Sequence, residues 1–260
     1  MRSDEGENVE VFRGKVLSYL TSKVERGERL HFLLIDPDKV SSVEKLAKSV
    51  KEVVESGCDA ILIGGSLAVT AYDVDSILNA LQGVSVPKIL FPGSVAGISR
   101  NADAVLFMSL LNSIDPYYII GAQMSAAPII KKFGLEPIPT AYIIVGYGGA
   151  AGYVGLARPV PLNKPEIAAA YALAAKYMGM KVVYLEAGSG APTHIPGSFV
   201  KVVKSAVGDD MIVLVGGGIR SIDAVKDVLR GGADGVVTGT IFEENPELCI
   251  EIVKTVKSFR

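Results

Sequence analysis

The sequence has 260 residues, of which 49% are hydrophobic and 21% charged, and its formal net charge is -2. This length suffices for one eight-stranded α/β barrel, and no linker divides the chain, so we expect a single domain over residues 1–260. A near-neutral charge without a Lys/Arg cluster argues against a nucleic-acid binder. No apolar run is long enough for a signal peptide or a membrane span, so we expect a cytoplasmic protein.

Eight short apolar runs rich in β-branched residues predict buried parallel strands, and segments of helical pattern separate most of them. The strands are expected at His31–Ile35, Ala60–Ile63, Lys88–Phe91, Ala104–Met108, Ala141–Val145, Val182–Glu186, Ile212–Val215 and Gly235–Thr238. The helices are expected at Ser42–Ser56, Val69–Leu81, Pro116–Phe133, Pro165–Met178, Pro196–Val207, Ile222–Gly231 and Pro246–Phe259. This alternation leaves an open doubly wound sheet or a closed barrel, and eight repeats favour an α/β fold of the (β/α)8 TIM-barrel type.

The segment that precedes the first strand is expected to lie outside the barrel wall. Residues 1–9 are acidic and are expected to form a flexible tail. The amphipathic stretch Val9–Glu25 follows and is expected to cover the bottom of the barrel.

The first strand ends in LLIDPDK, which delivers Asp36 and Asp38 to the edge where barrel active sites are built. Two acidic groups beside a phosphate site would repel the ligand unless a cation lies between them, which points to Mg²⁺. After the second strand, Ser66 offers a hydroxyl oxygen of the kind that Mg²⁺ accepts. The alternative is a turn and helix cap, which fits Asp38 well and Asp36 less well, so Asp36 is the expected metal ligand.

The third crossover is too short for a helix. Only PGSVAGISRNAD lies between Phe91 and Ala104, whereas a βαβ connection normally needs a dozen or more residues including its helix. The missing helix would leave apolar faces exposed on one side of the barrel. Two interpretations remain open: an irregular connection sealed by a neighbouring subunit, or a groove for an extended apolar ligand.

A long glycine-rich loop, Gly146–Asn163, follows the fifth strand and carries two tyrosines. Loops of this length in compact domains are usually lids or binding loops, and this one falls on the active side of the barrel. We expect a mobile lid rather than a passive insertion.

The sixth strand ends in YLEAGSGAP. Strand periodicity directs Tyr184 and Glu186 inward and Val183 and Leu185 outward. A carboxylate at this position can hydrogen-bond a substrate hydroxyl or take its proton, although a structural ion pair is the alternative for Glu186. An inward Tyr184 can also simply fill the core.

The strongest local signal is a pair of glycine-rich turns after the seventh and eighth strands. VGGGIRS covers Val215–Ser221, and GADGVVTGT covers Gly232–Thr240. Glycines at these points let backbone N–H groups approach a phosphate, and the loops after strands seven and eight are the usual phosphate site of barrels. The pair indicates a phosphorylated ligand and does not specify the reaction.

The remaining polar candidates are expected to be structural. His31 and His194 have no Ser or Cys beside them in a nucleophile setting, which argues against a catalytic triad. Cys58 and Cys249 lie far apart in apolar contexts, which predicts buried free thiols in a reducing compartment.

Seven segments together resemble the geranylgeranylglyceryl phosphate synthase family, which includes the bacterial heptaprenylglyceryl phosphate synthases. The segments are LLIDPDK, ILIGGS, LLNSIDPYYIIGAQ, PTAYIIVGYGG, YLEAGSGAP, GGGIRS and GADGVVTGT, in the family's order from Leu33 to Thr240. The resemblance implies a modified TIM barrel whose third helix is replaced by an irregular connection. It implies transfer of a prenyl group from geranylgeranyl diphosphate to the primary hydroxyl of sn-glycerol 1-phosphate, with Mg²⁺, early in archaeal ether phospholipid synthesis.

The resemblance also implies site residues. Asp36 and Ser66 match the Mg²⁺ ligands, and the residues that match the glycerol phosphate site are Tyr184, Leu185, Glu186, Ala187, Gly188, Ser189, Gly190, Gly217, Gly218, Gly239 and Thr240. The longer central loop resembles the family's second subgroup, which implies a homo-oligomer, a dimer or a hexamer. Membrane contact is expected to be transient at most, for product release.

The expected chemistry assigns catalytic roles to Glu186 and Tyr184. Glu186 is expected to orient the glycerol hydroxyls and to accept a proton, and Mg²⁺ on Asp36 is expected to neutralise the diphosphate. Arg100, in the short third connection, is a candidate diphosphate contact. Two alternatives stay open: another phosphate-binding barrel enzyme of the sugar-phosphate isomerase type, and a non-enzymatic sensor of a phosphorylated ligand.

Overall fold

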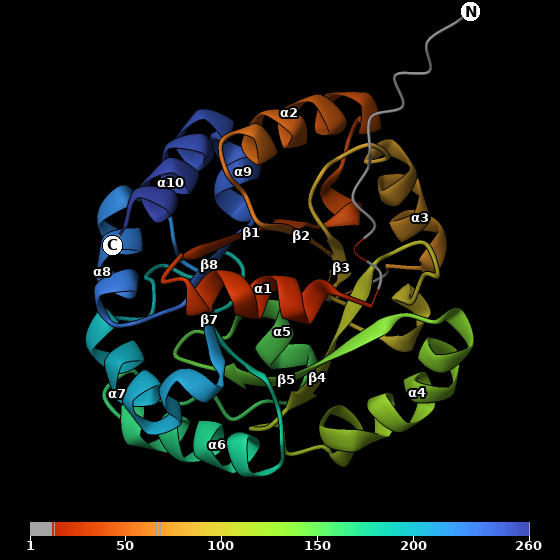
Figure 1. The fold of residues 1–260 in the computed structure, drawn as a ribbon. Helices are drawn as coiled ribbons and strands as arrows, with labels where there is room; N and C mark the ends of the chain where they lie inside the picture. Colours follow the sequence, from red (N-terminus) through yellow and green to blue (C-terminus); the bar gives the residue numbers. More distant parts are fainter. Residues whose placement is uncertain (1–11, 13, 66, 68, 260) are drawn as a thin grey trace, which may run out of the picture.

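The computed structural model describes residues 12, 14–65, 67 and 69–259, and these form a closed barrel of eight parallel strands surrounded by helices (Figure 1). Neighbouring strands pair in sequence order, and β8 closes the barrel against β1. The strands are β1 (Leu30–Ile35), β2 (Ala60–Ile63), β3 (Lys88–Leu90), β4 (Ala104–Leu110), β5 (Glu136–Ile144), β6 (Val182–Glu186), β7 (Ile212–Gly216) and β8 (Gly235–Thr238). The predicted fold class is confirmed.

The helices follow the expected pattern at most positions, with caps where the sequence offers them. Ser42, Ser221 and Asn245 each accept a backbone N–H from the first turn of the helix that they precede. The helices are α1 (Val16–Glu25), α2 (Val43–Glu55), α3 (Ala71–Ala80), α4 (Ala122–Phe133), α5 (Gly149–Val154), α6 (Pro165–Tyr177), α7 (Gly197–Val207), α8 (Ile222–Arg230), α9 (Thr240–Glu244) and α10 (Pro246–Ser258). A π-helical turn, η3 (Tyr117–Gly121), leads into α4, and short 3₁₀ turns are η1 (Pro37–Lys39), η2 (Val95–Gly97) and η4 (Gly208–Asp210).

The strands separate two apolar cores. Side chains that point inward, such as Phe32, Leu62 and Tyr184, fill the barrel interior. Those that point outward, such as Val183 and Leu185, pack against the surrounding helices. The alternation along β6 therefore agrees with the period-two expectation, and it brings Tyr184 and Glu186 to the inner face.

The connection between β3 and β4 has no α-helix, which confirms the prediction for the third crossover. Residues 91–103 are all described, and their only helical element is the 3₁₀ turn η2. No α-helix of this connection therefore packs between β3 and α4, and this gap in the helical layer, lined by η2, β4 and α4, shapes the site described below.

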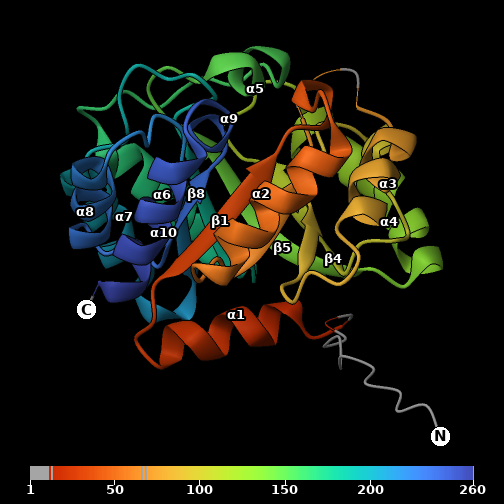
Figure 2. The ribbon, with the colours of Figure 1, turned by 90° about the horizontal axis from the view of Figure 1, so that it is seen from above.

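Helix α1 covers the end of the barrel opposite α5 (Figure 2). The side chains of Val16 and Leu20 join the interior core, and the Glu136 carboxylate accepts the N–H groups of Val16 and Leu17 at 2.7 and 3.0 Å. The predicted cover over Val9–Glu25 is thus confirmed for its described part. Residues 1–9, predicted to form a tail, lie outside the described residues.

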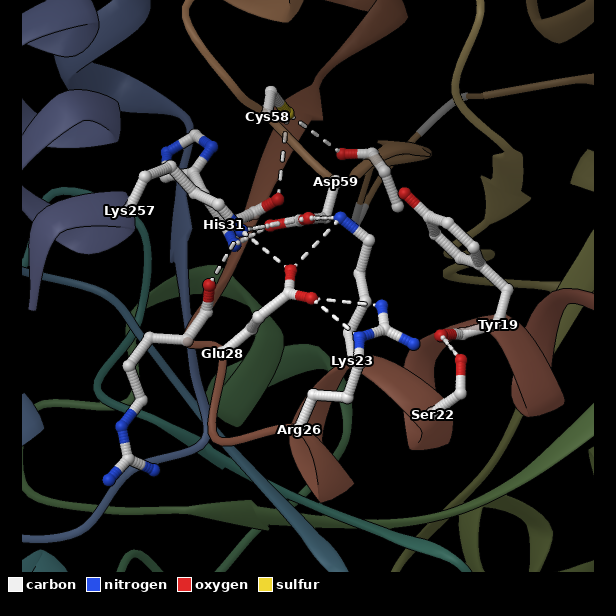
Figure 3. Close-up of polar contacts among 11 residues, drawn as sticks. Tyr19, Ser22, Lys23, Arg26, Glu28, His31, Cys58, Asp59 and Lys257 are labelled. Carbon is white, nitrogen blue, oxygen red and sulfur yellow. Dashed lines mark hydrogen bonds and ion pairs between the residues drawn. The ribbon is translucent and has the colours of Figure 1, made fainter. Parts of the chain in front are cut away.

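A buried carboxylate anchors this cover to the rest of the fold (Figure 3). Asp59, immediately before β2, accepts hydrogen bonds from Lys23 of α1 at 2.7 Å and from Lys257 of α10 at 2.9 Å. It also accepts the backbone N–H of His31 at 2.8 Å. Burial alone would lower the pKa of Lys23, but the bond and charge of Asp59 raise it above its usual range. One side chain therefore ties α1, β1 and α10 together.

Candidate active site

The carboxyl ends of the strands open onto a pocket with a volume of about 200 Å³. Residues that follow β1, β2, β3, β6, β7 and β8 line it, and α4 and α5 complete its wall. Every loop that the sequence singled out for chemistry therefore reaches one cavity, as expected for the carboxyl face of a barrel.

Asp36 immediately follows β1, and its two carboxylate oxygens have different surroundings. Its Oδ1 atom is buried without a hydrogen-bond partner among the described residues, and Oδ2 lies 3.2 Å from the Lys39 ammonium. Burial, with a smaller contribution from Asp38, raises the pKa of Asp36 to about 6. A Cβ atom at Gly65 would overlap Oδ1, so the glycine after β2 makes room for this carboxylate. Ser66, the other expected metal ligand, lies outside the described residues.

Glu186 ends β6 and is buried at the floor of the pocket. Its Oε1 accepts the N–H of Gly188 at 2.6 Å, and no cationic side chain of the described residues acts on it. Burial raises the pKa of Glu186, although the hydrogen bond from the Gly188 N–H acts against this increase. The carboxyl group is therefore held in place and kept more basic than usual.

The rings of Phe91, Tyr142 and Tyr184 pack against one another next to Glu186. Tyr184 stacks on Phe91 with centroids 5.5 Å apart and meets the edge of Tyr142 at 5.3 Å. Burial, followed by the charge of Glu186, raises the pKa of Tyr184 well above its usual range. Its hydroxyl is buried without a hydrogen-bond partner among the described residues, so Tyr184 fills the core and also presents a free polar atom at the pocket.

The glycine-rich turns after β6, β7 and β8 meet beside Glu186. Gly188 and Gly217 both have positive φ, and a Cβ atom at Gly217 would lie 2.5 Å from Glu186 Oε1 and 2.7 Å from the Gly188 nitrogen. Ser189 Oγ and Thr240 Oγ1 are 3.4 Å apart, which joins the turns after β6 and β8. Only glycine permits this close approach of backbone to backbone, which exposes N–H groups to an anion.

The expected glycerol phosphate residues divide into those that line the pocket and those behind it. Lining residues are Tyr184, Glu186, Ser189, Gly217, Gly218, Gly239 and Thr240. Gly188 and Ala187 are buried behind them, and Gly190 is exposed. The side chain of Leu185 packs outward in the helical core, which leaves it no side-chain contact with the pocket.

An apolar groove extends from the pocket through the gap left by the missing helix. It passes between the β3–β4 connection and α4, and its lining includes Val95, Ile98, Val105, Phe107, Ala122, Ala126 and Ile130. Val105 and Phe107 belong to the outer face of β4, so the groove leaves the barrel interior and reaches the helical layer. This geometry matches the open-groove interpretation of the short third connection.

Among the described residues, Lys39 and Arg220 are the cationic side chains that line the pocket. Each pairs with a carboxylate of the short helix α9: Lys39 with Glu243 at 3.3 Å, and Arg220 with Glu244 at 3.6 Å. Sequence reasoning missed both as site residues, although both stand in the quoted motifs LLIDPDK and VGGGIRS. Arg100, the expected diphosphate contact, instead lies over the ring of Phe133 at 4.9 Å, outside the lining.

The long loop after β5 folds over the pocket. It contains helix α5, whose residues Ala151 and Val154 line the cavity. The loop is attached at its base, where Gly148 N–H donates to the Ala187 carbonyl at 2.7 Å. The expected lid position is therefore occupied by a short helix in direct contact with the glycine-rich turn after β6.

The two histidines and two cysteines lie where structural roles are expected. His31 Nε2 is 2.9 Å from Thr238 Oγ1, and burial lowers the pKa of His31 to about 3. His194 pairs with Asp227 at 3.0 Å near the start of α7. Cys58 and Cys249 are buried free thiols, as predicted.

Known proteins resemble this chain over nearly its whole length. The family model described as the PcrB family matches residues 23–257. Geranylgeranylglyceryl phosphate synthase of Sulfolobus acidocaldarius is 48% identical, with 96% of each chain covered. The protein of the same name from Hyperthermus butylicus is 52% identical, with 90% of this chain and 96% of that chain covered.

A solved structure shows the same likeness in three dimensions. The crystal structure of (S)-3-O-geranylgeranylglyceryl phosphate synthase from Thermoplasma acidophilum contains its substrate sn-glycerol-1-phosphate. It is 38% identical to this chain, covers 94% of it and 99% of its own length, and superposes with a TM-score of 0.88. The chain therefore belongs to the PcrB family, that of the geranylgeranylglyceryl phosphate synthases.

Proposed function

We propose that this protein is a prenyltransferase that joins geranylgeranyl diphosphate to the primary hydroxyl of sn-glycerol 1-phosphate and releases diphosphate. The observation that carries the proposal is the continuity of an apolar groove with a glycine-lined anion site, with Glu186 between them. Relatives of this name, and the glycerol phosphate complex of the Thermoplasma acidophilum enzyme, support it. The reaction belongs to archaeal ether phospholipid synthesis.

The residues between the groove and the anion site suit this transfer. The allylic carbon–oxygen bond breaks, its electron pair leaves with the diphosphate, and the glycerol oxygen bonds to the same carbon. Glu186 accepts the proton of that hydroxyl, a role favoured by its raised pKa. The rings of Phe91 and Tyr184, both in the lining, face the positive charge that develops on the allylic carbon.

Mg²⁺ is part of the proposal, and Asp36 would hold it. Its buried, unpartnered Oδ1 is an oxygen ligand of the type that Mg²⁺ prefers. The described residues contain no group of three or more acidic, His or Cys side chains that could enclose a metal, which fits an ion completed by substrate phosphates and water. When bound, Mg²⁺ would neutralise charge on the diphosphate. Ser66 is the second proposed ligand.

The leaving diphosphate is assigned to Lys39 and Arg220 instead of Arg100. Diphosphate and glycerol phosphate together bring several negative charges to a pocket that already contains Asp36 and Glu186. Lys39 and Arg220 would exchange their carboxylate partners on α9 for oxygens of the diphosphate, which carries more negative charge than a carboxylate.

The surroundings of the reaction complete the proposal. We place it in the cytoplasm, in a homo-oligomer, with transient membrane contact for product release. In the part of the chain that the structure describes, none of the helices has the length and apolarity needed to cross a bilayer. Ile167, Tyr177 and Met178 leave an exposed apolar strip on and just after α6 that a second copy could cover. Light scattering of the purified protein measures the assembly.

The test is incubation with sn-glycerol 1-phosphate, radiolabelled geranylgeranyl diphosphate and Mg²⁺. A labelled phospholipid that partitions into organic solvent is the expected product. Tight binding of both compounds without any product would instead indicate a sensor. Turnover of a sugar phosphate without use of the prenyl diphosphate would indicate an isomerase, although the apolar groove has no use in that reaction.

A further inference from the structure

We propose that the surface formed by residues 114–134 and 147–164 docks on an anionic lipid bilayer, so that the mouth of the groove faces the membrane. The proposal rests on the proposed function, since the product is a phospholipid with a long hydrocarbon tail. It names the surface and the chemistry of its partner, which the reaction itself leaves open.

Exposed apolar side chains concentrate on this surface. Eight of the fourteen large hydrophobic side chains that the described residues expose lie within it: Ile114, Tyr117, Ile120, Met124, Tyr147, Tyr153, Leu156 and Leu162. Isolated exposed apolar residues are ordinary, but a concentration of this kind marks an interaction site. Tyrosine is also a residue favoured at the boundary of a bilayer.

The two segments form one continuous surface. Ile114 N–H donates to the Leu156 carbonyl at 3.0 Å, and Arg158 N–H donates to the Asn112 carbonyl at 2.8 Å. Ser113 pairs with Ala157 in an antiparallel bridge. The segment that precedes η3 and the segment that follows α5 therefore lie side by side, with Ile114 and Leu156 as neighbours.

The charge of this surface complements an anionic membrane. In residues 114–134 and 147–164, Asp115 is the only acidic residue, in a chain that has 28 Asp and Glu residues. The same stretches contain Lys131, Lys132, Arg158 and Lys164. Basic residues beside exposed apolar and aromatic side chains are typical of elements that lie in the membrane interface, where each Lys or Arg adds attraction to anionic lipid. A protein partner would require no such depletion of acidic residues.

The surface is also the outer side of the groove wall. Ala122, Ala126 and Ile130 of α4 line the groove, whereas Ile120 and Met124, on the opposite side of the same segment, are 63% and 68% exposed. Tyr117 is exposed and meets the edge of Tyr118, which lines the pocket, with centroids 5.1 Å apart. One thin wall thus separates the proposed lipid tail from the proposed bilayer.

The experiment is sedimentation of the full chain with vesicles of phosphatidylcholine alone or of phosphatidylcholine with phosphatidylglycerol. We expect binding to the anionic vesicles and at least tenfold weaker binding for the double variant Ile120→Glu, Met124→Glu. Tyr72→Glu is the matched control, because Tyr72 is a helical, apolar residue with 83% exposure outside this surface. The variant Lys131→Gln, Lys132→Gln should bind more weakly, and its binding should be less sensitive to salt.

Several results would overturn the proposal. They are wild-type protein that does not bind anionic vesicles, a double variant that binds as wild type does, and an equal loss for Tyr72→Glu. If the double variant changes the mass by light scattering but not vesicle binding, the surface belongs to a second copy. Because vesicle binding needs no substrate, failure here is separable from failure of the prenyl transfer assay.

Discussion

At the scale of single residues, Glu186 is the group whose environment differs most from that of an ordinary surface carboxylate. It is buried, lacks an ion pair with any described residue and is oriented by the Gly188 N–H. We predict that Glu186→Gln lowers kcat by about 100-fold or more, the usual contribution of a general base, and leaves the melting temperature close to that of wild type. Glu166→Gln, on the exposed face of α6, is the control.

The pH dependence of kcat/KM provides a second measurement on the same residue. A base must be deprotonated, and burial raises the pKa of Glu186 above its usual value, so activity should fall as pH decreases through that raised pKa. The acid limb should therefore lie above the range of a surface glutamate and should be absent from the residual activity of Glu186→Gln. An acid limb that is unchanged in this variant would assign the proton transfer to another group.

The proposed role of Asp36 is tested by measuring how product formation depends on Mg²⁺. We predict that EDTA abolishes product formation and that Mg²⁺ restores it. Asp36→Asn should require at least tenfold more Mg²⁺ for half-maximal activity, because an amide oxygen is a weaker ligand than a carboxylate. Asp38→Asn, whose carboxyl group is exposed, should keep the wild-type requirement. Equal requirements in the two variants would remove Asp36 from the metal site.

The sequence predicted the residues of the site better than it predicted their partners. Motifs at strand ends located Asp36, Glu186 and the glycines, because the carboxyl face of a barrel collects whatever follows each strand. The pairing of Lys39 with Glu243 joins residues 204 positions apart, and no local pattern carries that information. Strand periodicity predicted that Leu185 points outward, whereas the family resemblance alone placed it among the glycerol phosphate residues.

At the scale of elements, the contact between the α5 loop and the glycine-rich turn after β6 has a sharp test. A Cβ atom at Gly188 would lie 2.5 Å from the Gly148 carbonyl carbon and from the Gly149 nitrogen. We predict that Gly188→Ala raises the KM for glycerol phosphate at least tenfold. Gly190→Ala is the matched control, because Gly190 also has a positive φ but open space at the Cβ position, and it should cause only a small change.

Helix α5 and strand β5 differ from the prediction for identifiable reasons. Helix α5 was missed because Gly149 and Gly152 are poor helix formers, and its position over the pocket provides the packing that propensity does not. Strand β5 begins at Glu136 and not at the predicted Ala141, and it includes Pro137 and Pro139, residues that are depleted in strands. The Pro139 carbonyl accepts the backbone N–H of Lys181, on the side that faces β6. The pairing of β5 with β6 begins at Thr140, so the N–H groups that the prolines lack interrupt no strand pairing.

At the scale of the whole molecule, the Asp59 cluster at the bottom of the barrel should control stability without touching chemistry. Asp59→Asn would leave the ammonium groups of Lys23 and Lys257 without their shared carboxylate. We predict a loss of about 3–5 kcal/mol in the free energy of unfolding, typical of a broken buried pair. Denaturant titration measures it, and kcat of the folded fraction should not change.

The control for this prediction is another lysine–aspartate pair in an exposed setting. Lys176 and Asp210 are 2.6 Å apart, but the Asp210 side chain is largely exposed. Asp210→Asn should therefore cost no more than about 1 kcal/mol. If Asp59→Asn were as mild, the cluster would not be the anchor of α1.

The global architecture was the most predictable level. Eight strands, most of them separated by helices, favour closure into a barrel. The short stretch after β3 predicted that this crossover has no helix. The place of the groove followed from that short connection, but its lining was not predictable, because its two sides come from Ile98 and Ala126, on elements separated by β4. Side chains that meet across such a distance in sequence are specified only by the complete packing.

Because the β3–β4 crossover has no α-helix, the diameter of the barrel also does not limit the length of the ligand. A complete ring of helices would force a twenty-carbon molecule into the interior, where every methylene accommodated requires an equal volume of core to be removed, at a cost in stability. A passage through the wall would avoid this exchange, because the added carbons would extend along the outside of β4. The enzyme scaffold can therefore keep a densely filled centre whatever the size of its lipid.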